Sequence, residues 1–196
     1  MDRRKVEKHL TRQFEQQVAR ASIEREQKYR IKDVRPVRRL LLKLGATPHT
    51  SGFERNELFD RDGWLSTKGR KLRLRRHGRN VAMLTLKGPR LKGTQKARME
   101  VETPVDYEAT KRILELMGFR VNETYSKLRE EYRLDGCPVC LDHVPDCGWF
   151  VEIEGTRGRI IDIARRLQLR SSDRELRSYR KLIKEQAEAA ALRFAA

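Results

Sequence analysis

The sequence predicts an α+β fold whose main element is an antiparallel β-sheet. Many segments alternate charged and apolar residues with a period of two, the spacing of side chains on the two faces of a strand. Turns that contain glycine separate neighbouring segments, and two stretches with helical spacing each end at a glycine. These observations together favour one sheet-dominated domain that also carries helices.

The first part of the chain is expected to form a strand, a helix and a second, short strand. Residues 22–32 alternate as a strand does. Apolar residues then follow helical spacing from Val34 to Leu44, and Gly45 stands at the expected C-terminal position of this helix. A short strand is predicted over residues 56–59, before a turn rich in Asp and Gly.

A dense β region follows, and a hairpin is its first unit. Residues 71–77 and 81–87 alternate on either side of a turn that contains Gly78 and Asn80. The dipeptide Gly88-Pro89 is expected to end the second strand, because proline cannot donate a ladder hydrogen bond.

The rest of the chain repeats these elements. Asp106 is expected to cap a helix that runs to Met117 and closes at Gly118. The tail over residues 173–196 is rich in Ala, Arg and Glu and is predicted to be helical. The remaining strands are expected over residues 96–103, 121–134, 138–144 and 149–155.

Composition sets the class of protein and of partner. The chain has 196 residues and a formal net charge of +17, with 38% hydrophobic residues and no apolar run long enough to span a bilayer. We expect a cytoplasmic protein with no membrane contact and an affinity for polyanions. The expected organisation is a basic N-terminal extension (1–20), one domain (21–185) and a helical tail (186–196).

Two weaker patterns leave alternatives open. Strand, helix and glycine over residues 22–45 are echoed over residues 96–118, which indicates two similar halves; two amphipathic helices that each end at glycine are the simpler alternative. The spacing of Cys137, Cys140, His143 and Cys147 has enough ligands for a structural zinc site, although the same segment alternates like a strand.

Like charges recur two residues apart on the predicted strands, and acidic and basic pairs occupy different strands. Such neighbours repel each other unless opposite charge lies between them. If the sheet curls with this face inward, carboxylates form one wall and bases another. The pairs are Glu24/Glu26, Arg73/Arg75, Glu100/Glu102, Lys127/Arg129 and Glu152/Glu154.

This arrangement suits phosphate chemistry. Arg and Lys can hold the oxygens of linked phosphates, and Arg adds bidentate geometry. Carboxylates repel phosphate directly but can hold Mg²⁺ or Mn²⁺, which prefer oxygen ligands. A metal held in this way could bridge the carboxylates to the phosphates and orient a nucleophile.

The motifs resemble those of the CYTH domain family, the triphosphate tunnel metalloenzymes, which includes class IV adenylyl cyclases, thiamine triphosphatases and inorganic triphosphatases. Glu24-Arg-Glu-Gln-Lys28 resembles the family's Glu-x-Glu-x-Lys signature, and Ser178-Tyr179-Arg-Lys-Leu182 resembles the close of its adenylyl-cyclase-like members. Between them lie, in the expected order, Leu72-Arg-Leu-Arg75, Thr85-Leu-Lys87, Arg98-Met-Glu-Val-Glu102, Lys127-Leu-Arg129, Leu141-Asp142 and Phe150-Val-Glu-Ile-Glu154.

The resemblance implies a closed eight-stranded antiparallel β-barrel with helices packed outside, and it assigns roles to residues. The triphosphate would be held by Lys28, Arg73, Arg75, Lys87, Lys127 and Arg129, with Arg30, Lys71, Arg98 and Arg133 as weaker candidates. Metal ligands are expected among Glu24, Glu26, Glu100, Glu102, Asp142, Glu152 and Glu154. The catalytic candidates are Glu24, Glu26, Lys28, Lys87 and Tyr179.

Three functions stay open at this point. Water could attack the terminal phosphorus of tripolyphosphate or an organic triphosphate. Alternatively, the ribose hydroxyl of ATP could attack the α-phosphorus to give cyclic AMP and pyrophosphate. The third alternative is a non-catalytic module that binds polyphosphate or RNA, with nucleic acid as a secondary partner. A monomer or a homodimer is expected in each case.

Overall fold

The computed structural model describes residues 22–78, 81–91 and 96–194. The predicted N-terminal extension, Asn80 of the predicted hairpin turn and the last two residues lie outside these ranges. Within the described residues, no helix is both long enough and apolar enough to cross a membrane.

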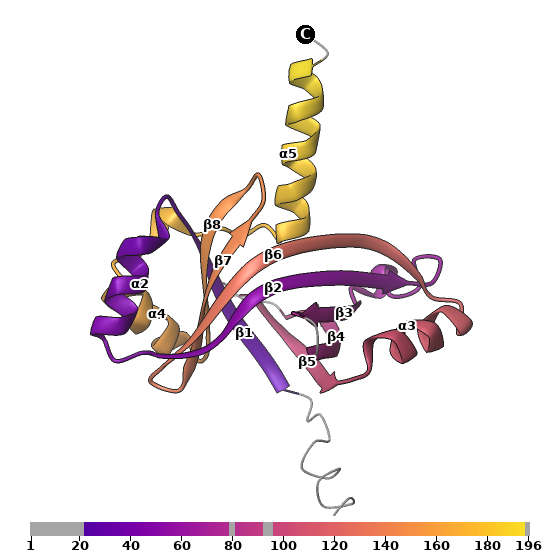
Figure 1. Cartoon of the computed structure of the whole chain (residues 1–196), viewed down its shortest axis with the longest axis horizontal. Helices are drawn as coiled ribbons and strands as arrows, with labels where there is room; N and C mark the ends of the chain where they lie inside the picture. Colours follow the sequence, from indigo (N-terminus) through magenta and orange to yellow (C-terminus); the bar gives the residue numbers. More distant parts are fainter. Residues whose placement is uncertain (1–21, 79–80, 92–95, 195–196) are drawn as a thin grey trace, which may run out of the picture.

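Eight antiparallel strands close into a barrel, as predicted (Figure 1). Around the barrel the order is β1-β5-β4-β3-β2-β6-β7-β8, with β8 pairing back onto β1. The strands are β1 (Ser22–Ile31), β2 (Thr47–Asp60), β3 (Lys71–His77), β4 (Val81–Arg90), β5 (Lys96–Pro104), β6 (Arg120–Leu134), β7 (Cys137–Val144) and β8 (Gly148–Glu154).

In the part of the chain that the structure describes, four α-helices lie outside the barrel: α2 (Val34–Lys43), α3 (Tyr107–Leu116), α4 (Arg157–Arg166) and α5 (Tyr179–Phe194). Asp33 caps α2 by accepting a hydrogen bond from the Arg35 amide, and Asp106 caps α3 in the same way from Ala109. In Figure 1, α2 and α4 lie together at one end of the barrel, α3 lies at the other, and α5 projects away from it.

The apolar side chains pack on the outside of the barrel, between the strands and the helices. The largest cluster joins Val37 and Leu41 of α2 and Ile163 of α4 to the outer faces of β1, β6, β7 and β8. A second cluster lies under α3, and a third surrounds Tyr179 at the start of α5. The charged face of the sheet is therefore left to form the interior.

The strand order has the symmetry that the sequence echo indicates. Exchanging β1–β4 with β5–β8 reproduces the same circular order of strands. Strands β1 and β5 pair with each other, as do β2 and β6, and α2 and α3 follow the first strand of each half. The chain therefore contains two similar halves that together close one barrel.

Three predicted boundaries are wrong, and one helix was not predicted. The short strand over 56–59 is the end of β2, which begins at Thr47 and tolerates Pro48 and Gly52. Strand β4 continues through Gly88-Pro89 to Arg90, with an irregularity at this dipeptide. The C-terminal helix α5 begins at Tyr179, after an irregular segment, and α4 is the helix that was not predicted.

The zinc alternative is also wrong. Cys137 packs in the cluster beneath α2 and α4, whereas Cys147 packs in the separate cluster around Tyr179. Among the described residues, the only group of three or more potential ligands that lie close enough to share an ion consists of three glutamates. The cysteines are therefore buried strand and turn residues with free thiols.

Candidate functional site

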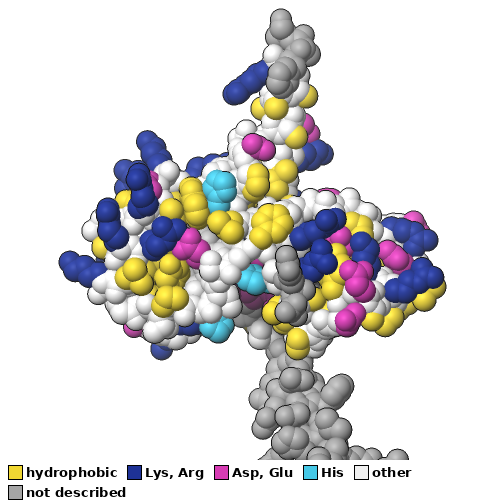
Figure 2. Space-filling model, viewed as in Figure 1, with side chains coloured by type: hydrophobic (Ala, Val, Ile, Leu, Met, Phe, Trp, Pro, Cys, Tyr) yellow, Lys and Arg dark blue, Asp and Glu magenta, His cyan; other side chains and the backbone are white. Residues whose placement is uncertain are grey.

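The inside of the barrel is a charged cavity that is open to solvent. Its lining includes ten Lys or Arg side chains and four Glu side chains, with Leu58, Tyr125, Ser178 and Tyr179 between them. A second cavity opens on the other side and shares Glu24, Arg73, Arg75, Arg129 and Glu154 with the first, so the two meet inside the barrel. The surface also carries many Lys and Arg side chains (Figure 2), so net charge alone does not locate the site.

Carboxylates from β1 and β8 meet at one point of the wall. Glu24, Glu26 and Glu154 each place a carboxylate oxygen within 4.8 Å of the others. Burial and, after it, the negative charges of Glu24, Glu152 and Glu26 together raise the pKa of Glu154 to about 7, although Arg129 opposes the shift. Because these carboxylates repel one another, the arrangement favours a bound cation.

The two carboxylates of β5 have basic partners. Glu100 lies 2.8 Å from the Lys87 Nζ, and Glu102 accepts hydrogen bonds from Thr85 and Arg73. Burial and a hydrogen bond with Glu100 raise the pKa of Glu24, whereas the same bond lowers that of Glu100 despite burial. The ionisation of the two carboxyl groups is therefore coupled, and their hydrogen bond favours the neutral form of Glu24 and the ionised form of Glu100.

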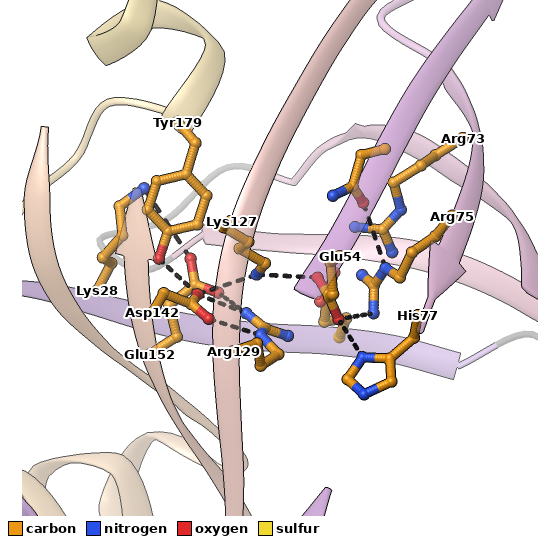
Figure 3. A network of polar contacts seen from close by, with 12 residues as sticks. Lys28, Glu54, Arg73, Arg75, His77, Lys127, Arg129, Asp142, Glu152 and Tyr179 are labelled. Atoms are coloured by element: carbon orange, nitrogen blue, oxygen red, sulfur yellow. Dashed lines mark hydrogen bonds and ion pairs between the residues drawn. The ribbon is translucent and has the colours of Figure 1, made fainter. Parts of the chain in front are cut away.

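Asp142 of β7 is fully buried and is the centre of a network (Figure 3). Arg129 donates to both of its oxygens at 2.7 Å, Lys127 donates at 2.9 Å and the Tyr179 hydroxyl donates at 2.7 Å. Burial opposes ionisation, but Arg129 and Lys127 hold the pKa of Asp142 far below its usual value. Neither cavity lining includes Asp142. Its carboxylate therefore neutralises Arg129 and Lys127 and does not line the cavity.

Glu152 lies between the glutamates Glu24, Glu26 and Glu154 and the network around Asp142. Its carboxylate accepts a hydrogen bond from Arg129 at 2.6 Å and lies 3.9 Å from the Lys28 Nζ. Lys28 is itself buried, with its Nζ 3.9 Å from the centre of the Tyr179 ring. Glu152 therefore neutralises two bases at the position where β1 pairs with β8.

Sequence reasoning missed Glu54 of β2. It is buried, and its carboxylate lies 3.3 Å from Arg75, 3.4 Å from Lys127 and 3.7 Å from His77 (Figure 3). Burial opposes ionisation, yet Lys127, Arg129 and Arg75 lower the pKa of Glu54 to about 2. If the predicted strand had been extended toward the N-terminus, the alternation of Glu54, Asn56 and Leu58 would have indicated that Glu54 shares their face.

All six predicted phosphate-binding residues line the cavity: Lys28, Arg73, Arg75, Lys87, Lys127 and Arg129. The structure separates the weaker candidates. Lys71 and Arg98 line the same cavity, whereas Arg133 lines only the second one. Arg30 lines neither cavity and donates to the Cys147 carbonyl at 2.6 Å. Two more bases that sequence reasoning missed, Arg90 and Arg180, also line the main cavity.

The family follows from comparison with known proteins. Residues 22–179 match the CYTH domain model, and the chain belongs to the CYTH domain family. Over 136 residues it is 32% identical to a candidate adenylate cyclase of Methanocaldococcus jannaschii; the match covers 67% of this chain and 76% of that one.

Solved structures share the fold. A candidate adenylate cyclase of Vibrio parahaemolyticus superposes with a TM-score of 0.75 at 22% identity, covering 84% of this chain and 99% of that one. A Pyrococcus horikoshii protein gives 0.70 at 26% identity, covering 81% and 98%. An adenylyl cyclase-type protein of Hippeastrum, described as having a dominant triphosphatase activity, gives 0.57 at 17% identity, covering 75% and 88%.

Proposed function

We propose that this chain is a metal-dependent enzyme that hydrolyses the terminal phosphate of a linear triphosphate inside the barrel. The observation that carries the proposal is the placement of the glutamate group, Glu24, Glu26 and Glu154, in the same cavity as the basic side chains. Carboxylates alone would repel phosphate, and a site that bound phosphate through bases alone would not require carboxylates. The two together fit a phosphate chain that is bound through a divalent cation.

The glutamate group fits Mg²⁺ or Mn²⁺. It offers three oxygen ligands within 4.8 Å of one another, and these hard cations prefer oxygen. Repulsion from Glu24, Glu152 and Glu26 adds to burial in raising the pKa of Glu154, and a bound cation would relieve that repulsion. A bound ion would neutralise phosphate charge at this wall and help to orient the nucleophile.

The bases then bind and position the phosphates. Lys87 lies 2.7 Å from Glu24, and Arg73 lies 3.3 Å from Glu102. If Glu24 held a metal ion, Lys87 would become available to phosphate oxygens. Positioning and neutralisation of charge are the main requirements of phosphoryl transfer, so the protein need not supply a covalent nucleophile.

We assign Asp142, Glu54 and Tyr179 to positioning. Asp142 and Glu54 fix Lys127, Arg129 and Arg75 by direct ion pairs. The Tyr179 hydroxyl is committed to Asp142, and its ring packs edge-on against Phe150. Tyr179 therefore closes the cavity and orders its bases instead of acting on the substrate.

The residues that line the main cavity favour hydrolysis over cyclisation. One water is consumed: its oxygen forms a P–O bond to the terminal phosphorus and the bridging P–O bond breaks. The diphosphate end of the substrate is the leaving group, orthophosphate is the other product, and the protons of the water pass to the products and to solvent. Cyclisation would require a place for adenine, but Tyr125 and Tyr179, the two aromatic residues of the lining, pack in one apolar cluster. The Hippeastrum relative supports hydrolysis, and the name of the Methanocaldococcus jannaschii relative makes cyclisation the second candidate.

Product analysis tests the proposal. The protein is incubated with tripolyphosphate, ATP or thiamine triphosphate, each with Mg²⁺, Mn²⁺ or EDTA. We expect orthophosphate only when the divalent ion is present. Cyclic AMP and pyrophosphate from ATP would establish the cyclase instead. No product from any substrate, together with tight, steeply salt-dependent RNA binding in EDTA, would favour the binding module.

Two variants test the metal group. Glu24→Gln and Glu154→Gln keep the side-chain shape but remove a charged ligand, and we expect each to lower kcat/KM at least about 100-fold, as loss of roughly 3 kcal/mol of transition-state stabilisation would. The matched control is Glu188→Gln on α5, where the carboxylate is exposed and, among the described residues, its nearest basic group, Lys184, is 3.8 Å away. Full activity in both variants would contradict the assignment.

A further inference from the structure

Four basic side chains lie at the end of the main cavity that is away from the second cavity. They come from β3, β4, β5 and the first turn of α5, and we call them the mouth cluster: Lys71, Arg90, Arg98 and Arg180. Arg90 is exposed and the other three are half-buried, so the cluster lies at the rim.

An irregularity in β4 turns Arg90 toward the cavity. Between the pairs Lys87↔Glu100 and Arg90↔Arg98, β4 advances by three residues while β5 advances by two. The extra residue reverses the alternation of β4, and Arg90 therefore shares the inward face of Arg98. Without it, Arg90 would point to the outside of the barrel.

The mouth cluster is held together against repulsion. Arg90 and Arg98 are direct cross-strand partners, and like charges in that position destabilise a sheet. Burial lowers the pKa of Lys71 to about 8, and the positive charges of Arg180, Arg98 and Arg90 contribute to this shift. Glu24, which is the cross-strand partner of Arg98 on β1, and Glu26 attract Arg98, although among the described residues neither forms an ion pair with it within 4.0 Å.

Protein counter-charge is scarce at this rim. Glu123 pairs with Arg180 at 2.5 Å. Over the part of the chain that the structure describes, no ion pair within 4.0 Å involves Lys71, Arg90 or Arg98. Deeper in the cavity the bases do have such partners, for example Arg75 with Glu54 and Lys87 with Glu100. An anionic ligand would therefore be attracted most strongly at the rim, where the protein's own carboxylates neutralise the bases least.

We propose that the mouth cluster binds phosphate groups beyond the third, and that the substrate is a linear inorganic polyphosphate longer than tripolyphosphate. This inference rests on the proposed function, because it places the terminal phosphate beside the glutamate group and the rest of the chain toward the rim. Arginine side chains can bind phosphate oxygens in bidentate fashion, whereas a nucleoside would place neutral groups among these charges.

A chain-length series tests this proposal. We compare kcat/KM for tripolyphosphate, tetrapolyphosphate and a longer linear polyphosphate in the wild type and in the double variant Arg90→Gln/Arg180→Gln. The wild type should prefer the longer chains by about tenfold, the equivalent of roughly 1.4 kcal/mol of added binding. The double variant should lose most of that preference while its activity on tripolyphosphate changes less than about twofold.

Binding without turnover gives a second readout. Calorimetric titration in EDTA should show that the double variant loses affinity for the longer chain but not for tripolyphosphate. The matched control, Arg39→Gln/Arg157→Gln, removes the same charge from exposed positions on α2 and α4. It should leave the dependence on chain length unchanged.

The outcomes separate the two proposals. If tripolyphosphate is cleaved but longer chains gain nothing in rate or in binding, the mouth-cluster assignment is wrong and the proposed function stands. If no chain is cleaved, the proposed function fails, and titration alone decides whether the rim binds phosphate. A 5′-triphosphorylated RNA preferred over polyphosphate of equal charge would also overturn the inorganic assignment.

Discussion

Replacement of Glu54 by glutamine would remove one buried negative charge from the basic side of the barrel. The variant resembles the protonated form of Glu54, so the free-energy difference between the ionised and neutral forms measures its cost. The pKa of Glu54 is lowered from 4.5 to about 2. At 1.36 kcal/mol per pKa unit, Glu54→Gln should lower the free energy of unfolding by about 3 kcal/mol at pH 7.

The cost should depend on pH in a defined direction. Because the folded pKa lies below the unfolded one, the stabilisation is fully present above about pH 4.5 and is lost as pH falls through about 2. The difference between wild type and variant should therefore shrink to about 2 kcal/mol near pH 3.5, since the wild-type carboxylate is itself increasingly protonated in the unfolded state.

Urea unfolding at these two pH values measures both quantities. Glu188→Gln, which removes an exposed carboxylate on α5, is the control and should change stability by less than about 0.5 kcal/mol. A cost below about 1 kcal/mol at pH 7, or an equal cost at both pH values, would refute the reasoning. Either result would mean that Arg75 and Lys127 do not depend on Glu54.

Two further substitutions test the architecture around the site. Asp142→Asn should lower the free energy of unfolding by about 3 kcal/mol, because it removes the buried negative charge shared by Arg129 and Lys127; urea unfolding at pH 7 measures it. Gly155→Ala should cost about 1–3 kcal/mol in the same assay. Its φ of 151° is one that L-residues rarely adopt, and an added Cβ would lie 2.9 Å from the Cys137 Sγ.

Neighbouring positions provide the controls for both substitutions. Asp146→Asn changes an exposed turn residue with φ of 60°, which asparagine tolerates, and should be close to neutral. Gly158→Ala lies within α4, where an added Cβ meets nothing within 4 Å, and should stabilise by about 0.5–1 kcal/mol. A near-neutral effect of Asp142→Asn would disprove the stabilising role of the ion pairs around Asp142. A Gly155→Ala variant that is as stable as its control would disprove the steric explanation for Gly155.

Most strands could be predicted because their information is local. The alternation that places Arg73 and Arg75 on one face and Leu72 and Leu74 on the other is visible in seven consecutive residues. Helix α2 was equally readable, from the helical spacing of its apolar residues and its close at Gly45. By contrast, β2 was cut short because Pro48 and Gly52 oppose a strand locally, although pairing with β3 and β6 overrides that preference.

Part of the site depends on contacts that no local pattern contains. Glu24 and Glu154 are 130 positions apart in the chain and meet because β8 pairs with β1. Glu54 is placed by its neighbours on β3 and β6, and Arg90 by an irregularity in the register between β4 and β5. Register and closure are set by the whole barrel, so single-strand reasoning could not assign these partners.

The sequence by itself determined which residues share a face, because side chains alternate along any strand whatever surrounds it. It therefore identified six bases that line the cavity and the acidic strands opposite them. Only the tertiary structure decided what those charges do. Closure divided them into three groups: the three carboxylates that lie together, the acids that neutralise deep bases such as Arg129, and the rim bases Lys71, Arg90 and Arg98, which form no ion pair within 4.0 Å among the residues that the structure describes. The reason is physical: charge pairing falls off within a few ångströms, and such distances exist only after strands distant in the chain have been brought into register.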